Sequence, residues 1–600
     1  YSTTGTPQVT NLALLADLDN NGNGKLILQT PVAANGNLRI SANDIDAGTS
    51  GARLSAVQLL VRSGQSEQIR VDLKPAGVGQ PGTLDAASAA DLEIVADSAV
   101  QLQDLNGDGT ALQSSLPTGN LSLLTNGNLL VSSKLQTSGN ITLYSTGNLT
   151  VNAQIDPEQV SLSAADDILI NSRIDAVRLV KISAGDDGTG SLLTTAASRI
   201  EATNGAAIGD ITLSAGSTVG SMQLNGFIRA AGKLSASVPA GSLNADAELQ
   251  AGILQLQAAT GIGQAAPIRV SAASITAETQ NGDLQLISSG PTVFHSLSTG
   301  TGDIRITSNG HSDFSNVRTN NGQLRLNVVN GNLRLGTGTA VTGSIFLTTT
   351  SSGNLLIDLA NASGLLVADS AGSITDSTND TDIDINAAQI QLRARSGIGT
   401  TTNALGLSGP SATVTAFTAT GDIVLQTGSS ITVGQVDQQS GLQISDPDNA
   451  DGQNLISVTA AGRLIIDSPI VNQSAGSIQL TATDHIIQSA STLILTSGSG
   501  LISLVAGTAQ SSIGADITMQ DGAGIVSQQG RIQLHSSGSV RLSSVRSTSG
   551  RLEIQAGTTT VAGSLLDNTQ AESPNLLTSG SVSLSASGNV GGPGNDEDID

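Results

Sequence analysis

The chain has 600 residues, with 69 Gly, 5 Phe and 2 Tyr but no Cys and no Trp. The lack of Cys excludes a disulfide scaffold and thiol chemistry. The formal net charge of −24 disfavours nucleic acids and anionic membrane surfaces as partners, and no run approaches the roughly 18 apolar residues of a membrane helix.

Short strands with one buried face are predicted along most of the chain, because apolar and polar residues alternate. Residues 119–123 (GNLSL) return twenty residues later as 139–143 (GNITL), and 127–131 (GNLLV) return as 147–151 (GNLTV). Related units begin at Gly282, Gly302 and Gly322, and again at residues 530 and 550. A Gly precedes each strand, where a turn would need a positive φ. A fixed period of this size is typical of a solenoid.

The predicted fold is all-β, a right-handed parallel β-helix solenoid with coils of about 20 residues. An antiparallel sandwich does not need near-identical units one period apart, and a propeller needs a period of roughly 40 residues. In a β-helix each residue stacks on the one a period later. We therefore expect Ile304 to lie over Leu324 inside, Arg305 over Arg325 outside, and Asn120 over Asn140 in a side-chain amide ladder.

Two segments lose the period and are predicted to be irregular. They are an insertion at 75–118 and a loop at 434–460, between β-helix coils at 1–74, 119–433 and 461–600. Inside the insertion, Pro81 to Ala90 could form a turn or two of helix. We expect the whole to be one continuous rod, cut from a longer protein.

The G-[ND]-[IL]-x-[IL] strands, the coil of nearly twenty residues and the aromatic-poor, Ser/Thr/Asn-rich composition resemble the filamentous-haemagglutinin-type large exoproteins of Gram-negative bacteria. The resemblance covers most of the chain. It implies a right-handed β-helical protein, secreted or anchored at the cell surface, that serves adhesion, matrix or envelope structure. An amino-terminal secretion domain of the two-partner type is not seen in the sequence.

Seven polar residues are predicted as candidate calcium ligands: Asp104, Asn106, Asp108, Asp166, Asp167, Asp186 and Asp187. Residues 104–109 match the start of an EF-hand loop, although Ser115 stands where the final Glu should be. Residues 166–167 and 186–187 are twenty apart, so we expect their carboxylates to stack on adjacent coils. The alternatives are an Asx-rich turn for the first group, and a solvated turn or a catalytic cluster for the second.

Two acidic runs are predicted to be solvated faces, with collection of divalent cations as the alternative. They consist of Asp376, Asp380, Asp382 and Asp384, and of Asp596, Glu597, Asp598 and Asp600. The 4 His residues share no metal-binding spacing and are predicted to be ordinary surface or turn residues.

The leading functional hypothesis is a non-catalytic structural segment of a giant extracellular fibre or cell-surface layer, self-associating end to end or side by side. An adhesin stalk, whose loops bind a cell-surface or glycan partner, is the alternative. A glycan-active enzyme using the Asp166 and Asp186 region is the third hypothesis. The scarcity of aromatic residues argues against it, because sugars usually stack on such rings.

Overall fold

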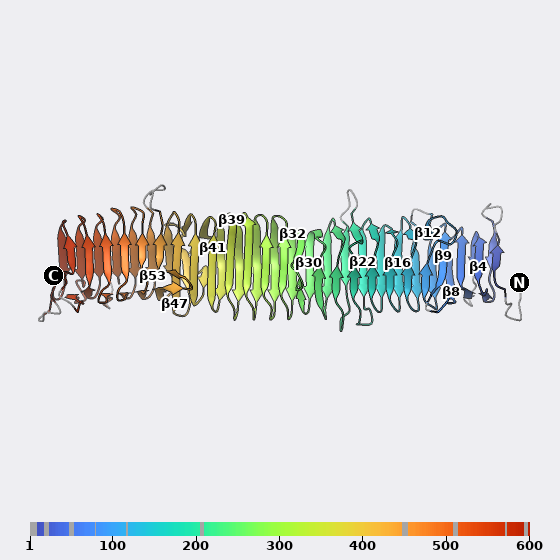
Figure 1. Cartoon of the computed structure of the whole chain (residues 1–600), viewed down its shortest axis with the longest axis horizontal. Coiled ribbons are helices and arrows are strands. Elements are labelled where there is room, and N and C mark those ends of the chain that lie inside the picture. Colours follow the sequence, from blue (N-terminus) through green and yellow to red (C-terminus); the bar gives the residue numbers. More distant parts are fainter. Residues whose placement is uncertain are drawn as a thin grey trace. The chain divides into compact units, whose positions relative to one another are not determined.

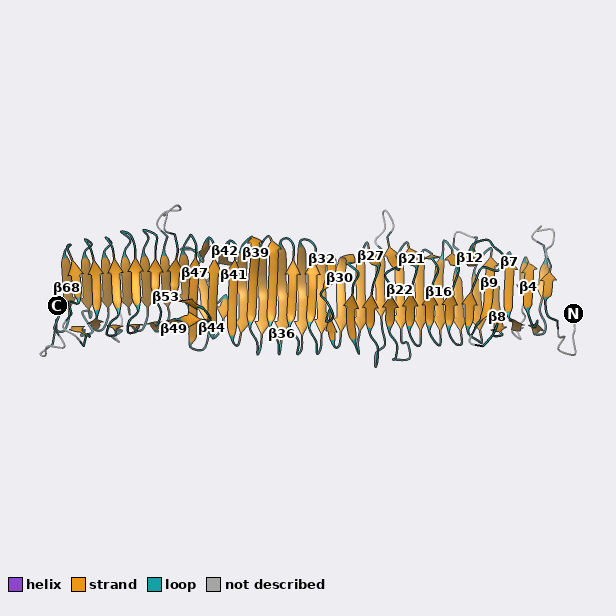
Figure 2. Ribbon diagram, viewed as in Figure 1, coloured by secondary structure: helices purple, strands orange, loops and turns teal. Residues whose placement is uncertain are grey.

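The computed structural model describes residues 9–16, 23–46, 53–65, 67–78, 80–115, 118–203, 209–446, 454–507, 514–570, 573–592 and 598–599. Within these ranges the chain forms strands and turns and no helix (Figure 2). It divides into two compact units, Tyr1–Ser289 and Gly290–Asp600. Both are solenoids of stacked parallel strands with coils about 22 residues apart (Figure 1). The all-β parallel β-helix is thus confirmed, with a coil slightly longer than predicted, while its handedness stays a prediction.

Three strands make up each coil in the clearest part of the first unit. In one coil these are β13 (Leu121–Thr125), β14 (Leu129–Val131) and β15 (Lys134–Gln136). Each pairs with its counterpart on the next coil, so that Leu121 lies opposite Ile141 and Leu129 opposite Leu149. The strands that follow are β16 (Asn140–Ser145), β17 (Leu149–Val151), β18 (Ile155–Asp156), β19 (Gln159–Ala164), β20 (Ile168–Ile170), β21 (Arg173–Ala176), β22 (Leu179–Ala184), β23 (Leu192–Thr194), β24 (Arg199–Ala202), β25 (Asp210–Ser214) and β26 (Met222–Leu224).

The second unit begins with two long strands per coil and continues with three shorter ones. The long strands are β34 (Thr292–Thr299), β35 (Ile304–Ser308), β36 (Ser312–Thr319), β37 (Leu324–Asn330), β38 (Leu333–Ala340), β39 (Ile345–Ser352), β40 (Leu355–Ala362) and β41 (Leu365–Ser370). The later coils include β53 (Ile456–Ala460), β54 (Leu464–Ile466), β55 (Ile470–Asn472), β56 (Ile478–Ala482), β57 (Ile486–Gln488), β59 (Ile502–Ala506), β60 (Ile517–Met519), β62 (Ile532–Ser536) and β65 (Leu552–Ala556).

Columns of aliphatic side chains fill the interior, as the repeat predicts. Ile304 lies opposite Leu324 with both side chains fully buried, and Arg305 lies opposite Arg325 on the outer face. Two of the Phe residues join these columns, whereas Phe227, Phe346 and Phe417 are half-buried on the outer face beneath Arg side chains. The rings of Phe294 and Phe314 stack inside with their centroids 4.6 Å apart. These contacts repeat from coil to coil, so the core of each unit grows along one axis.

Glycine before a strand serves close packing more often than a turn. The Gly that precedes β65, Gly550, does not have a positive φ. A Cβ atom at this position would instead overlap the carbonyl oxygen of Gly530 on the preceding coil. The turn-based explanation predicted from the sequence is therefore wrong at this position. The residue is needed because two backbones approach too closely for a side chain.

Most of the segment predicted as an insertion at 75–118 belongs to the solenoid. It contains β9 (Gly82–Ser88), β10 (Leu92–Ala96), β11 (Val100–Leu102) and β12 (Thr110–Ser114). Strands β10 and β11 pair in parallel with β13 and β14. The helical turn predicted at Pro81 to Ala90 is also wrong, since β9 occupies it. The strand was missed because β9 reads GTLDAAS, which lacks the second aliphatic position of the G-x-[ILV]-x-[ILV] unit, and all its residues are buried, polar Thr83 and Asp85 included.

The segment at 434–460 contains a short excursion from the solenoid. Strands β50 (Gln435–Val436) and β51 (Gln439–Ser440) form an antiparallel hairpin. The chain then rejoins the stack through β52 (Leu442–Ile444), which pairs with β47 (Ala412–Thr418) and β55. Residues 447–453 lie outside the described residues.

Candidate functional site

The loop that begins at Asp104 is closed by its own hydrogen bonds. One carboxylate oxygen of Asp104 accepts the N–H groups of Asn106 (3.1 Å) and Gly107 (2.6 Å), and the other accepts that of Gly109 (2.8 Å). These donors, the N–H of Gly109 foremost, hold the pKa of Asp104 below its ordinary value. The geometry is that of an Asx-rich turn, the alternative weighed from the sequence.

Asp108 in the same loop is neutralised by Arg62. The Arg62 guanidinium lies 3.3 Å from Asp108 and 2.7 Å from Asp85, an almost fully buried residue of β9. Asp85 also accepts the N–H of Leu105 at 2.7 Å, so it ties the loop to the strand beneath. Burial raises the pKa of Asp85 despite the nearby Arg62. Neither Arg62 nor Asp85 was singled out from the sequence, because both lie outside residues 104–109, whose resemblance to an EF-hand loop drew attention to this site.

The two acidic pairs at 166–167 and 186–187 do not stack as predicted. Ala164 lies opposite Ala184, but Ile168 lies opposite Leu192, because the second connection is longer by four residues. Asp167 therefore faces Ser191, whose N–H it accepts at 2.7 Å. The twenty-residue spacing between the two acidic pairs could not show that extra residues follow the second pair.

Asp186 and Asp187 instead bind neighbouring hydroxyl and amide groups. Asp186 accepts the hydroxyls of Ser163 and Ser183. Asp187 accepts the N–H and the hydroxyl of Thr189 at 2.9 and 3.0 Å, and these bonds lower its pKa. Among the described residues, no three His, Asp or Glu side chains are placed so that they could hold a metal ion.

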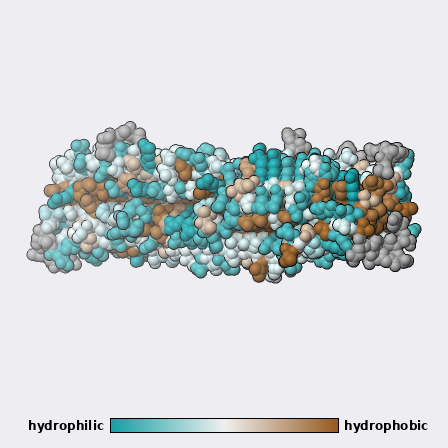
Figure 3. Space-filling view, turned by 45° about the vertical axis from the view of Figure 1, so that its right-hand side comes forward, coloured by the Kyte–Doolittle hydropathy of each residue, from teal (hydrophilic) through white to brown (hydrophobic). Residues whose placement is uncertain are grey.

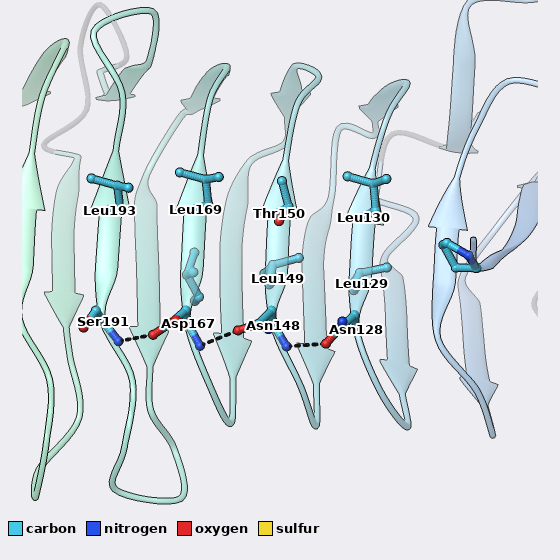
Figure 4. A pocket seen from close by; sticks show the side chains of 12 residues that line it. Asn128, Leu129, Leu130, Asn148, Leu149, Thr150, Asp167, Leu169, Ser191 and Leu193 are labelled. Carbon is cyan, nitrogen blue, oxygen red and sulfur yellow. Dashed lines mark hydrogen bonds between the residues drawn. The ribbon is translucent and has the colours of Figure 1, made fainter. Parts of the chain in front are cut away.

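A ladder of side-chain acceptors runs from coil to coil beside β14, β17, β20 and β23 (Figure 4). The N–H of Asn148 donates to the side-chain oxygen of Asn128, that of Asp167 to Asn148, and that of Ser191 to Asp167, at 2.9, 3.0 and 2.7 Å. The ladder continues from Ser191 to the N–H of Ser221. The predicted amide ladder therefore exists in a different form, because each side chain bonds a backbone N–H and not another side-chain amide.

A groove of about 550 Å³ lies beside this ladder. Leu130, Thr150, Leu169 and Leu193 line it as one outward-facing column, and Leu193 is 41% exposed. Apolar patches of this kind interrupt a largely hydrophilic surface on the face shown in Figure 3.

Two histidines of the second unit occupy ladder positions. The Nδ1 atom of His311 accepts the N–H of Asn332 at 3.0 Å, and Nδ1 of His485 accepts the N–H of Asp516 at 2.8 Å. They take the place that Asn and Asp have in other coils. Their role was missed because the sequence search looked for metal-binding spacings only.

The acidic run at 376–384 is only partly solvated. Asp380 and Asp382 are exposed, but Asp376 and Asp384 are 7% and 2% exposed. The prediction of a solvated face is therefore wrong for these two residues. Asp376 ends β42 (Ser373–Asp376) and accepts the N–H and hydroxyl of Thr378 and the N–H of Asp380. Of the second acidic run, Asp596, Glu597 and Asp600 lie outside the described residues.

The buried carboxyl groups of Asp376 and Asp384 are neighbours, and a hydrogen bond between them requires a proton on one of the two. One oxygen of Asp384 also accepts the N–H of Gly406 at 2.6 Å. Burial, together with the nearby carboxylates of Asp376 and Asp380, raises the pKa of Asp384 to about 8. Burial raises the pKa of Asp376 too, but the hydrogen bonds from Thr378 and Asp380 outweigh it and leave the value low. One proton is thus held between two buried side chains at neutral pH.

Two further pairs of side chains with the same spacing occur in this unit. The side-chain amide of Asn454 donates to Asp446 at 2.9 Å, eight residues earlier. That of Asn575 donates to Asp567 at 2.6 Å across the same spacing. All four side chains are buried. A search for Asp followed eight residues later by Asn or Asp would have found these loops.

Comparison of the chain with family models, with curated proteins and with solved structures gives no match. Within the described ranges there is no helical segment with the length and apolar character needed to traverse a bilayer.

Proposed function

We propose that this chain is a non-catalytic structural segment of a giant extracellular fibre or cell-surface layer protein of the filamentous-haemagglutinin type. In this role it would extend along its own axis and associate with further copies end to end or side by side. The observation that carries the proposal is the ladder from Asn128 to Ser191, together with the parallel pairing of the strands beside it.

The ladder supports a structural role because the same hydrogen bond, from a backbone N–H to a side-chain oxygen of the preceding coil, recurs along the axis. Each coil offers side-chain oxygens to the next coil and receives the same from the one before. A buried aliphatic column follows the same axis, as at Leu143, Leu162 and Ile182. Such nearest-neighbour contacts let stability and length grow together.

Negative-stain electron microscopy of the purified chain, with sedimentation velocity on the same sample, tests the proposal. We expect assemblies of many copies with a repeating axial order as the concentration rises. A chain that stays monomeric at all concentrations, or that degrades acidic polysaccharides, would contradict it. A variant in the ladder, Asn148→Ala, should weaken the assemblies, while Asn148→Asp should preserve them because Asp167 shows that a carboxylate fits this position.

A second candidate function, an adhesin stalk with a cell-surface or glycan partner, is favoured by the groove on the first unit. Its outward-facing column, of which Leu193 is exposed, lies beside amide and carboxylate groups and offers both apolar and polar contacts. We expect labelled protein to bind cells or a glycan array, and Leu193→Ser to weaken that binding. Equal binding by the wild type and by Leu193→Ser would show that this groove is not the binding surface.

Calcium binding by the seven predicted ligands is tested by calorimetry on the metal-free protein. A saturable heat lost in Asp104→Asn or Asp186→Asn would support it. No heat above buffer would reject it, as we would expect if the N–H and hydroxyl donors around Asp104, Asp186 and Asp187 compete with the ion.

A further inference from the structure

Three pairs of buried side chains in the second unit share one construction, with the two residues eight positions apart. Two are closed by an Asn amide that donates to an Asp carboxylate, at Asp446–Asn454 and Asp567–Asn575. The third has Asp384 where the others have Asn. The Asp376 and Asp567 ends are also alike, since each accepts the N–H and hydroxyl of a Thr two residues on.

A carboxylate cannot take over the role of the Asn amide. The amide carries two N–H donors at every pH, whereas an ionised carboxylate accepts hydrogen bonds only. Asp384 can therefore bond Asp376 only while one of the two carries a proton. When both are ionised, two like charges meet in a buried place where water screens them poorly.

We propose that the Asp376–Asp384 pair is a proton-dependent closure of the loop between these residues, which opens when the shared proton is lost. The Asp446–Asn454 and Asp567–Asn575 pairs are its counterparts, and their hydrogen bonds do not depend on a proton. The inference goes beyond the proposed structural role and does not depend on it.

The surroundings of Asp384 favour this behaviour. The charged groups that face it are the carboxylates of Asp376 and Asp380, and both disfavour its ionised form. The backbone N–H of Gly406 is the compensating contact, at 2.6 Å. Because burial raises the pKa of Asp384 to about 8, the proton leaves in mildly alkaline solution. Loss of the proton turns Asp384 toward water and exposes the loop that Asp380 and Asp382 already place at the surface.

Hydrogen exchange read by mass spectrometry tests the proposal on the full chain. Protection of the peptide covering residues 377–387, corrected for intrinsic exchange rates, is compared at about pH 6 and about pH 9. We expect the wild-type loop to lose up to about tenfold protection for each pH unit as the pH rises toward about 8, and little more above that value. Asp384→Asn supplies a permanent donor, so its loop should keep the same protection at both pH values.

Two further variants make the comparison specific. Asp380→Asn removes a neighbouring negative charge that raises the pKa of Asp384 but leaves the pair intact, so the pH response should persist, shifted to lower pH. Asn575→Asp recreates the double carboxylate in the loop that follows Asp567, and that loop should gain the pH response. The proposal is overturned if the wild-type loop shows no pH response, if Asp384→Asn responds as the wild type does, or if a folded Asn575→Asp protein shows no response.

Discussion

At the scale of single residues, a glycine that precedes a strand is constrained by the neighbouring coil. Gly550 has no room for a Cβ because the carbonyl oxygen of Gly530 occupies that place. Gly364 stands at the matching position before β41, yet a Cβ there would meet its nearest atom, the hydroxyl oxygen of Ser344, at 3.5 Å. Glycine is therefore sterically required at position 550 but not at position 364.

We expect Gly550→Ala to lower the free energy of unfolding of the second unit by about 1–3 kcal/mol, the usual effect of overpacking. Gly364→Ala is the matched control and should be neutral or slightly stabilising, because it restricts the unfolded chain. Urea unfolding followed by circular dichroism measures both. Equal losses in the two variants would show that the close approach at Gly550 is not the cause.

Asp384 gives the stability of the second unit a pH dependence of defined sign. Its folded pKa of about 8 lies above the value of about 3.9 in an unfolded chain, so the folded state binds the extra proton between these limits. The stability it contributes is fully present below about pH 4 and is lost as the pH rises through about 8. Asp376, whose pKa is lowered, has the opposite sign and acts below about pH 4.

Between about pH 5.5 and about pH 8, the unfolding free energy should therefore fall by up to about 1.4 kcal/mol per pH unit from Asp384 alone. Asp384→Asn should flatten this slope, and urea titrations at several pH values measure it. A wild-type slope that the variant reproduces would assign the effect to another group.

At the scale of strands, stability should be local because each coil contacts only its neighbours. Leu504 in β59 lies in a fully buried column between Leu480 of β56 and Leu534 of β62. Ser503 beside it faces outward and is only partly buried.

We expect Leu504→Ala to destabilise this region by about 2–5 kcal/mol, the usual range for a buried Leu. Hydrogen exchange should rise in β56, β59 and β62 and stay unchanged in the coils of the first unit. Ser503→Ala, the control, should change exchange little. A rise spread evenly over the whole chain would instead indicate one cooperative unit.

The strands could be predicted from the sequence, but their connections could not. Ile304 and Leu324 were identified as a stacked pair because inward positions repeat in both residue type and spacing. The connection from Ala184 to Leu192 has no such signature, and its extra residues displaced the predicted partner of Asp167. Strand β9 likewise lacks the second aliphatic position of the repeat on which the prediction depends, and it buries polar residues such as Asp85.

The candidate site was harder to predict for the same physical reason. Asp104 and Asp376 each begin a run rich in Asp and Asn, yet Asp104 is half-buried beside an exposed turn and Asp376 is buried. The burial of each residue depends on which atoms of the adjacent coils lie over it. This is known only once the coils are stacked.

At the scale of the whole molecule, charge is the dominant long-range property. The 49 acidic and 25 basic residues give a net charge of −24, so copies repel one another. Salt shortens the reach of this repulsion from about 30 Å at 0.01 M to about 10 Å at 0.1 M.

We therefore expect self-association to increase with NaCl between about 0.01 M and about 1 M, as measured by sedimentation velocity at fixed protein concentration. Magnesium and calcium chlorides at equal ionic strength serve as controls. Equal effects would indicate general screening by divalent ions, and a larger effect of calcium would indicate specific binding. Association that weakens as salt rises would contradict a repulsive origin.

The ladder from Asn128 to Ser191 also favours one order in which the coils fold. Every oxygen in it belongs to the earlier coil and every N–H to the later one. A coil that has already formed therefore presents oriented acceptors before its successor exists. A chain that becomes available from its amino end can add coils one by one on a finished template, so each step closes only a loop about as long as one coil. Growth from the other end would have no such template.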